Sequence, residues 1–116
     1  MVRNDLGMTP GKTASQAGHA YLGAYIQALQ IRPHTAQAYS AEHPQSPGTK
    51  VCLQSDLVGL NQALDQAQTL GIPYFLVVDS GCENFFSGQP TITALGLGPA
   101  KKCEIKKITR RFQLLP

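Results

Sequence analysis

The chain has 116 residues, of which 42% are hydrophobic and 15% charged, with a net charge of +3. This length suits one domain with its own core, and no apolar run reaches the roughly 18 residues that a membrane-spanning helix needs. The first residues also lack the apolar stretch of a secretory signal. We therefore expect a single domain, residues 1–116, with no membrane association.

Cysteine usage and charge distribution narrow the class further. The three cysteines form neither a Cys-x-x-Cys pair nor a Cys/His cluster, which indicates reduced thiols in a cytoplasmic protein and no metal site. Residues 101–116 carry six lysines and arginines against one acid, Glu104, whereas residues 1–100 carry four against six. Positive charge gathered at one end is typical either of a nucleic-acid partner or of a solubilising surface helix. Charge alone does not decide between them.

Helices are predicted in four places along the chain. Thr9 and Pro10 can open the first, whose apolar residues recur at helical spacing until Pro33 interrupts it. Residues 34–42 predict a second, more polar helix. Ser55 is expected to cap a third that continues through Leu70 and ends at Gly71. A fourth is expected to begin at Pro99, with Ile105 and Ile108 facing inward.

Strands are predicted between these helices. The candidates are the end of a short strand at 1–3, a strand at 49–54, the continuous apolar run 74–78, and the alternating segment 91–97. The apolar run at 74–78 is of the kind found in strands buried on both faces. Helices alternating with short strands predict an α/β fold, a three-layer sandwich with a mixed four-stranded sheet flanked by helices.

The first helix carries a polar constellation. Lys12, Gln16 and His19 stand at i, i+4 and i+7, so they share one face of that helix. Lys12 lies in the first turn, where free backbone N–H groups favour negative charge. Such a pocket can hold a phosphate or stabilise an oxyanion. The alternative is a solvated polar stripe.

Asp79 is the second candidate. An acid directly after an apolar strand stands at the carboxyl end of that strand, where open α/β sheets usually place ligand sites. The alternative is a turn-initiating aspartate, since Ser80 and Gly81 follow it. Asp79 and Lys12 meet only if their elements are neighbours in the fold.

Two other chemistries have weaker support. Residues 7–13 read Gly-Met-Thr-Pro-Gly-Lys-Thr, close to a phosphate-binding P-loop, but three residues rather than four separate the glycines. Pro10 also removes one backbone N–H, and no apolar strand leads into the segment. Cys82 with His19 as its base would make a nucleophilic pair, yet nothing nearby lowers the pKa of that thiol.

The motifs together resemble a known family. The block Gly-Lys-x-x-x-Gln-x-x-His at 11–19, Asp-x-Gly at 79–81 and Gly-x-Gly-Pro at 96–99 resemble the type 2 peptidyl-tRNA hydrolases, and the likeness extends over essentially the whole chain. The resemblance implies hydrolysis of the ester between a peptide and the 3′-terminal ribose of tRNA. It also implies a mixed four-stranded sheet, no metal or cofactor and, in many members, a homodimer.

The resemblance also implies site residues. These are Lys12, Gln16, His19, Asp79 and a threonine of segment 91–93, for which Thr93 is the better match. We expect four basic residues to hold tRNA phosphates without reading sequence, namely Lys102, Lys106, Arg110 and Arg111. The chain departs from the family at Cys82-Glu83-Asn84, where a basic residue or histidine and then threonine are usual. This departure motivates an alternative, a non-catalytic RNA-binding or adaptor domain with the same fold.

Overall fold

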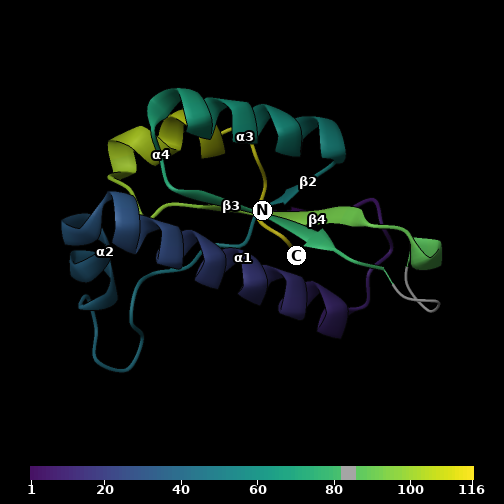
Figure 1. The fold of residues 1–116 in the computed structure, drawn as a ribbon, viewed down its shortest axis with the longest axis horizontal. Coiled ribbons are helices and arrows are strands. Elements are labelled where there is room, and N and C mark those ends of the chain that lie inside the picture. The colour runs from purple at the N-terminus through teal and green to yellow at the C-terminus, as the bar shows by residue number, and fades with distance from the viewer. Residues whose placement is uncertain (82–85) are drawn as a thin grey trace.

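The computed structural model describes residues 1–81 and 86–116, and it has three layers (Figure 1). A four-stranded sheet lies in the middle, with α1 and α2 covering one face and α3 and α4 the other. The predicted three-layer α/β sandwich is confirmed. Among the described residues, no helix combines the length and apolarity that a bilayer span requires. The helices are α1 (Pro10–Ile31), α2 (Pro33–Ser40), α3 (Leu57–Leu70) and α4 (Lys102–Thr109).

The sheet is mixed, as predicted. Its strands are β1 (Val2–Arg3), β2 (Gln54–Ser55), β3 (Tyr74–Asp79) and β4 (Thr91–Leu97). Their order is β2-β1-β4-β3. β1 runs parallel to β2 and antiparallel to β4, and β3 runs antiparallel to β4. The shortest strand that the sequence indicated, at 1–3, is therefore central.

Local signals explain where α1 begins and where α3 begins and ends. The hydroxyl of Thr9 accepts a hydrogen bond from the backbone N–H of Lys12 at 3.2 Å, and Pro10 opens α1. The cap predicted at Ser55 is wrong, because Ser55 pairs with Arg3 in the sheet. Asp56 caps α3 instead, its carboxylate accepting from Gly59 N–H at 2.9 Å. Gly71, at φ +68°, ends α3 in the left-handed conformation.

The strand predicted at 49–54 is mostly wrong. Only Gln54 and Ser55 form β2, and Leu53 makes an isolated bridge to Leu114 near the C-terminus. β1 offers two residues for parallel pairing, and these match Gln54 and Ser55. Val51 is exposed. Segment 49–52 also contains the polar residues Thr49 and Lys50, and the Cys52 carbonyl accepts from the backbone N–H of Leu115, so the C-terminal residues lie beside it where a strand was expected.

The apolar run at 74–78 is a strand, but the prediction that both its faces are buried is wrong. β3 lies at the edge of the sheet, and Phe75 and Val78 are exposed. The more deeply buried strand is β4, which lies between β1 and β3 and buries Thr93, Ala94 and Leu95 completely. α4 begins at Lys102 rather than Pro99, with Ile108 buried against α3 as expected.

Candidate active site

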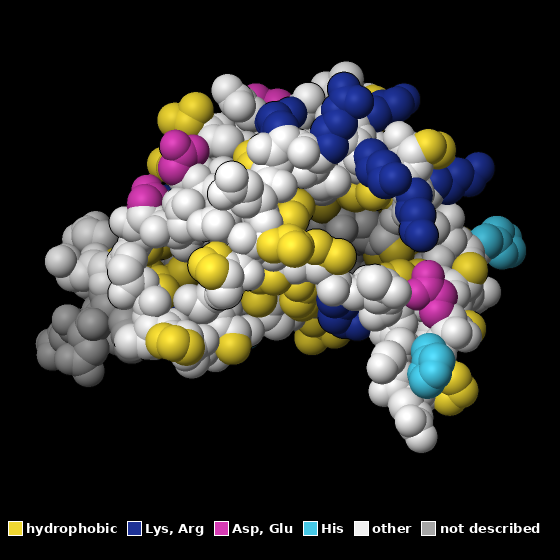
Figure 2. Space-filling model, turned by 180° about the vertical axis from the view of Figure 1, so that it is seen from behind, with side chains coloured by type: hydrophobic (Ala, Val, Ile, Leu, Met, Phe, Trp, Pro, Cys, Tyr) yellow, Lys and Arg dark blue, Asp and Glu magenta, His cyan; other side chains and the backbone are white. Residues whose placement is uncertain are grey.

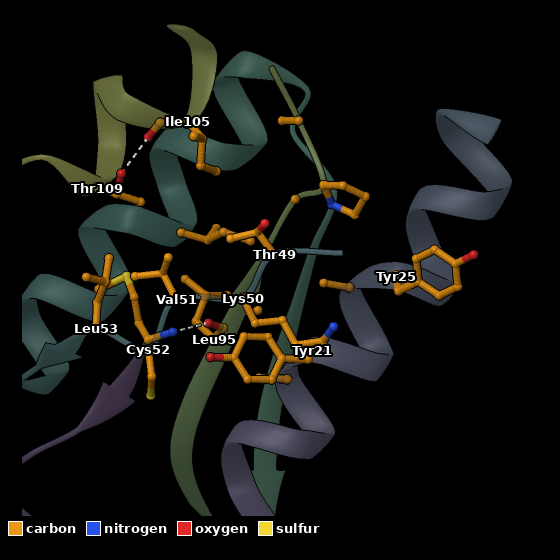
Figure 3. A pocket seen from close by; sticks show the side chains of 18 of the residues that line it. Tyr21, Tyr25, Thr49, Lys50, Val51, Cys52, Leu53, Leu95, Ile105 and Thr109 are labelled. Carbon is orange, nitrogen blue, oxygen red and sulfur yellow. Dashed lines mark hydrogen bonds between the residues drawn. The ribbon is translucent and has the colours of Figure 1, made fainter. Parts of the chain in front are cut away.

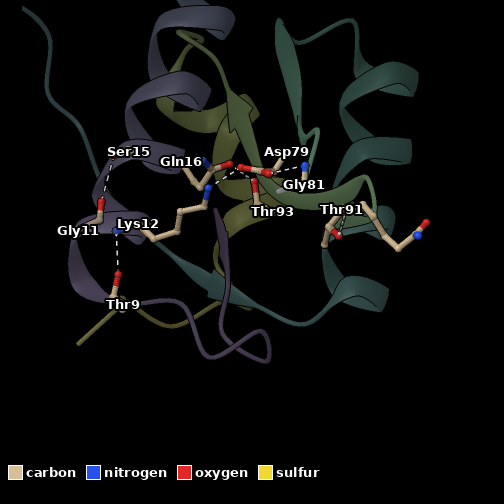
Figure 4. Close-up of polar contacts among 10 residues, drawn as sticks. Thr9, Gly11, Lys12, Ser15, Gln16, Asp79, Gly81, Thr91 and Thr93 are labelled. Carbon is tan, nitrogen blue, oxygen red and sulfur yellow. Dashed lines mark hydrogen bonds and ion pairs between the residues drawn. The ribbon is translucent and has the colours of Figure 1, made fainter. Parts of the chain in front are cut away.

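The side chains of Lys12 and Asp79 meet in the fold (Figure 4). Lys12 lies in the first turn of α1, and Asp79 is the last residue of β3. The Lys12 ammonium donates to Asp79 Oδ2 at 2.6 Å, and the two side chains are 16% and 14% exposed. Sequence spacing alone could not show this contact. The pair is shielded on most sides and still reaches the surface, as a site for a large substrate requires.

Hydrogen bonds occupy both oxygens of the Asp79 carboxylate. While Oδ2 accepts from Lys12, Oδ1 accepts from the backbone N–H of Gly81 at 2.8 Å. The bond from Lys12 holds the pKa of Asp79 below its usual range, with the Gly81 N–H and then the charges of Lys12 and His19 lowering it further. Asp79 is therefore ionised at neutral pH. It is a better hydrogen-bond acceptor than proton acceptor.

Gln16 and Thr93 form a second polar pair next to the first (Figure 4). Thr93 donates its hydroxyl proton to Gln16 Oε1 at 2.5 Å, and both side chains are buried. β3 pairs Val77 with Ala94 and Val78 with Ile92, so Thr93 is the extra residue of a bulge in β4. The bulge lets Thr93 face α1. Of the two threonines in segment 91–93, Thr93 is thus the one brought to Gln16, whereas Thr91 donates to the carbonyl of Gln89.

His19 lies one turn further along α1 and is exposed. It lines an open groove of about 920 Å³ between α1 and β3, together with Gln16 and Asp79. The fold therefore brings Lys12, Gln16 and His19 of α1 and Asp79 of β3 to one site, as expected. Gln16 lies at the bottom of this site and His19 at its rim.

Sequence reasoning did not single out Phe86 or the backbone of Gly81. The ring centroid of Phe86 lies 5.8 Å from the Lys12 ammonium, a cation–π distance. Phe86 has φ +55°, in the left-handed region that a bulky residue rarely adopts. An aromatic residue inside a loop rich in Gly, Ser and Asn was the available signal. Cys82, Glu83 and Asn84, where the chain departs from the family pattern, lie outside the described residues.

Comparisons with known proteins show the family of this chain. Residues 1–115 match the family described as "Peptidyl-tRNA hydrolase PTH2". The chain belongs to the PTH2 family of peptidyl-tRNA hydrolases. It is 32% identical to a peptidyl-tRNA hydrolase of Methanocaldococcus jannaschii, over 99% of this chain and 96% of that protein. A peptidyl-tRNA hydrolase of Methanopyrus kandleri is 35% identical, over 99% of this chain and 94% of its own length. A probable peptidyl-tRNA hydrolase 2 of Dictyostelium discoideum is 33% identical, over 98% of this chain and 52% of its own length.

The fold of this PTH2 chain removes the P-loop interpretation of residues 7–13. A P-loop holds phosphates with an irregular glycine-rich turn, whereas here Pro10 to Thr13 already belong to α1. The Lys12 side chain is paired with Asp79. Among the described residues, no group of three His, Cys, Asp or Glu side chains has the arrangement of a metal site.

The basic residues of α4 and the turn after it lie far from the Lys12–Asp79 pair. β3 runs away from α4, so Asp79 and α4 lie at opposite ends of the sheet (Figure 1), in a molecule 41 Å long. Lysine and arginine side chains gather at one end of the face shown in Figure 2. Glu104, the acid among them, is held by Arg32 through two hydrogen bonds of 3.0 and 3.1 Å. We call the four exposed residues Lys102, Lys106, Arg110 and Arg111 the α4 basic patch.

A second cavity, of about 480 Å³, lies between α1, segment 49–53 and β4 (Figure 3). Tyr21 and Tyr25 line it from α1, and Val51 and Cys52 line it from the opposite wall. Burial raises the pKa of Tyr21 to about 12. Because neither Lys12 nor Asp79 lines this cavity, it is separate from the candidate active site.

Proposed function

We propose that this protein hydrolyses the ester that joins a peptide to the 3′-terminal ribose of tRNA. The observation that carries the proposal is the Lys12–Asp79 ion pair, at the edge of an open groove, in a chain of the PTH2 family. The reaction releases a free tRNA and a peptide with a new carboxylate. The free tRNA can be aminoacylated again, and the amino acids of the peptide can be reused in translation. The enzyme is therefore suited to act on peptidyl-tRNA left by stalled ribosomes.

Water is the nucleophile in this proposal. Its oxygen attacks the ester carbonyl carbon, the bond from that carbon to the ribose oxygen breaks, and the proton of water ends on the ribose oxygen. Negative charge develops on the carbonyl oxygen during the attack. The Lys12 ammonium stabilises that charge, and a preformed cation needs little reorganisation to do so.

Asp79 holds Lys12 and orients the water. Two hydrogen bonds fix its carboxylate, and its lowered pKa makes it a weak base at neutral pH. Each carboxylate oxygen has a further lone pair, so the water can still donate to it. We therefore assign Asp79 orientation of Lys12 and water in preference to full proton removal.

Gln16 and Thr93 support the pair, and His19 faces the substrate. Since both Gln16 and Thr93 are buried and bonded to each other, we assign them the positioning of α1 against β4 beside the catalytic pair. His19 is exposed at the rim of the groove, where it can contact the terminal nucleotide or the ester.

The α4 basic patch holds the body of the tRNA. Its distance from Lys12 rules out contact with the ester itself, but other small RNA-binding domains span about 16 base pairs of duplex. One arm of a tRNA therefore reaches both ends of a 41 Å molecule. Contacts of this kind bind phosphates without reading sequence.

The deciding experiment follows release of free tRNA from peptidyl-tRNA by the native chain, Lys12→Ala and Asp79→Ala. If both substitutions abolish turnover, the result supports the proposal. Asp65→Ala, at an exposed position of α3, is the control. Salt-dependent tRNA binding without turnover by the native chain would instead indicate a non-catalytic adaptor. Turnover of nucleoside triphosphates with magnesium, indifferent to tRNA, would contradict both.

Three further properties complete the proposal. We expect hydrolysis to survive exhaustive dialysis against a chelator, since Lys12 supplies the positive charge that a metal would otherwise provide. We expect a homodimer, which sedimentation equilibrium would report as twice the 12.5 kDa chain mass. We expect a cytoplasmic location, which imaging of the tagged protein in its host would test.

A further inference from the structure

One wall of the groove between α1 and β3 consists of apolar residues that have no role in the proposed hydrolysis. Beyond His19 it is lined by Leu22 and Ile26 of α1 and Phe75 of β3, which are 60%, 50% and 42% exposed. Leu22 and Ile26 stand at i and i+4, so they form one apolar strip along α1. Gly23 lies between them, and a side chain there would collide with the Phe75 ring. The groove is thus open and apolar, and it leads directly to Asp79.

The floor of the groove is an open strand edge. β3 is the last strand of the sheet, and among the described residues no strand pairs with its outer side. The carbonyl of Pro73 accepts from Gly98 on the β4 side, whereas Tyr74 N–H donates to the Gln27 side chain of α1. Because backbone groups alternate along a strand, Leu76 and Val78 direct theirs outward. Such groups are free to pair with another extended chain.

We propose that this groove binds the peptide part of peptidyl-tRNA as an added strand on β3. The inference rests on the proposed function, which places the ester at Lys12 and Asp79. From there the peptide runs back along β3 towards Tyr74, parallel to that strand. Six strand residues span about 17 Å, enough for roughly five residues of peptide.

Two features of the groove match the chemistry of this ligand. An enzyme that accepts peptides of any sequence must recognise the main chain, and strand addition supplies main-chain hydrogen bonds. The apolar strip of Leu22 and Ile26 then contacts side chains without demanding a particular one. The groove lies on the α1 side of the sheet and the α4 basic patch on the other, so the peptide and the body of the tRNA do not compete for space (Figure 1).

The test compares two substrates with the same tRNA, one bearing a single N-acetylated residue and one bearing a five-residue peptide. We expect the native chain to prefer the longer substrate in kcat/KM. Leu22→Gln and Ile26→Gln should each reduce that preference roughly tenfold. Each substitution removes part of the apolar side-chain surface that the peptide would bury. Hydrolysis of the short substrate should be unchanged. Val58→Gln, an exposed apolar site on α3, is the matched control.

A second probe addresses the backbone. N-methylation of successive residues in the five-residue substrate should weaken kcat/KM at alternate positions, because only every second N–H of an added strand faces β3.

Each outcome has a distinct meaning. An unchanged length preference in both groove variants would overturn this inference while leaving the proposed function intact. Failure of the native chain to hydrolyse either substrate would overturn the proposed function and the inference with it. A lower sedimentation mass in the groove variants would show that a second copy of the chain occupies this face, which also overturns the inference.

Discussion

Lys12 and Asp79 lie 67 positions apart in the chain, and their side chains form an ion pair of 2.6 Å. One residue comes from the first turn of a helix and the other from the end of an edge strand. Their contact requires α1 to pack along β3, which it does over most of the length of that strand (Figure 1). The reactivity of either group therefore depends on the packing of the whole α1 layer.

Replacing Lys12 by Met tests how much its charge contributes. Met keeps the length and the apolar stem while removing the ammonium. We expect kcat/KM for peptidyl-tRNA to fall about 10²- to 10³-fold, as when an oxyanion-stabilising donor is lost. Circular dichroism should show an unchanged fold. A fall of less than about threefold would show that Lys12 does not act on the reacting atoms.

The ionisation of Asp79 should appear in stability at low pH. Its pKa is lowered in the folded state, so its carboxylate stabilises the fold above the ordinary aspartate pKa, and this contribution is lost as pH falls through the lowered value. Urea denaturation of the native chain and Asp79→Asn should therefore show a difference in unfolding free energy that is full at pH 6 and shrinks below pH 4. A difference independent of pH would contradict the lowered pKa of Asp79.

Thr93→Val tests the buried pair with Gln16. The substitution keeps the shape and leaves Gln16 Oε1 buried without its donor, which costs about 1–3 kcal/mol of unfolding free energy. Thr93→Ser keeps the hydroxyl and should recover most of that loss. We expect kcat/KM of Thr93→Val to fall by less than in Lys12→Met. Equal stability of the Val and Ser variants would remove the positioning role.

The α4 basic patch should act through salt-dependent binding. Each lysine or arginine that contacts a phosphate contributes about 1 to the slope of log Kd against log salt. Replacing Lys106 and Arg110 by alanine should lower that slope by about 2 and raise KM, with kcat nearly unchanged. Fluorescence anisotropy with labelled tRNA measures the slope. A loss of kcat at saturating substrate would place the patch at the ester instead.

Tyr21 should govern stability at alkaline pH. An unfolded tyrosine loses its proton near pH 10, whereas Tyr21 keeps its proton to about pH 12 in the folded chain. The unfolded state is therefore favoured as pH rises between these values, and the unfolding free energy should fall there. Tyr21→Phe should reduce that dependence in denaturant titrations at pH 9 and pH 11. A native chain as stable at pH 11 as at pH 9 would contradict the burial of this side chain.

The sequence alone determined those features that depend on a few neighbouring residues. Thr9 and Pro10 mark the start of α1, Gly71 marks the end of α3, and the alternation at 91–97 marks β4. The helical repeat of 3.6 residues also placed Lys12 and Gln16 on one face before any fold was known. Caps, turns and side-chain periodicity are short-range properties, so a linear reading captures them.

Only the tertiary structure decided which strand lies at the edge and which acid faces Lys12. The apolar composition of 74–78 indicated a fully buried strand, yet β4 occupies the buried place and β3 keeps an open side. The bulge at Thr93, the late start of β2 and the cation–π contact of Phe86 likewise arise from strand pairing and loop packing. These contacts join residues that are distant in the chain. Their free energies depend on partners that no local pattern encodes.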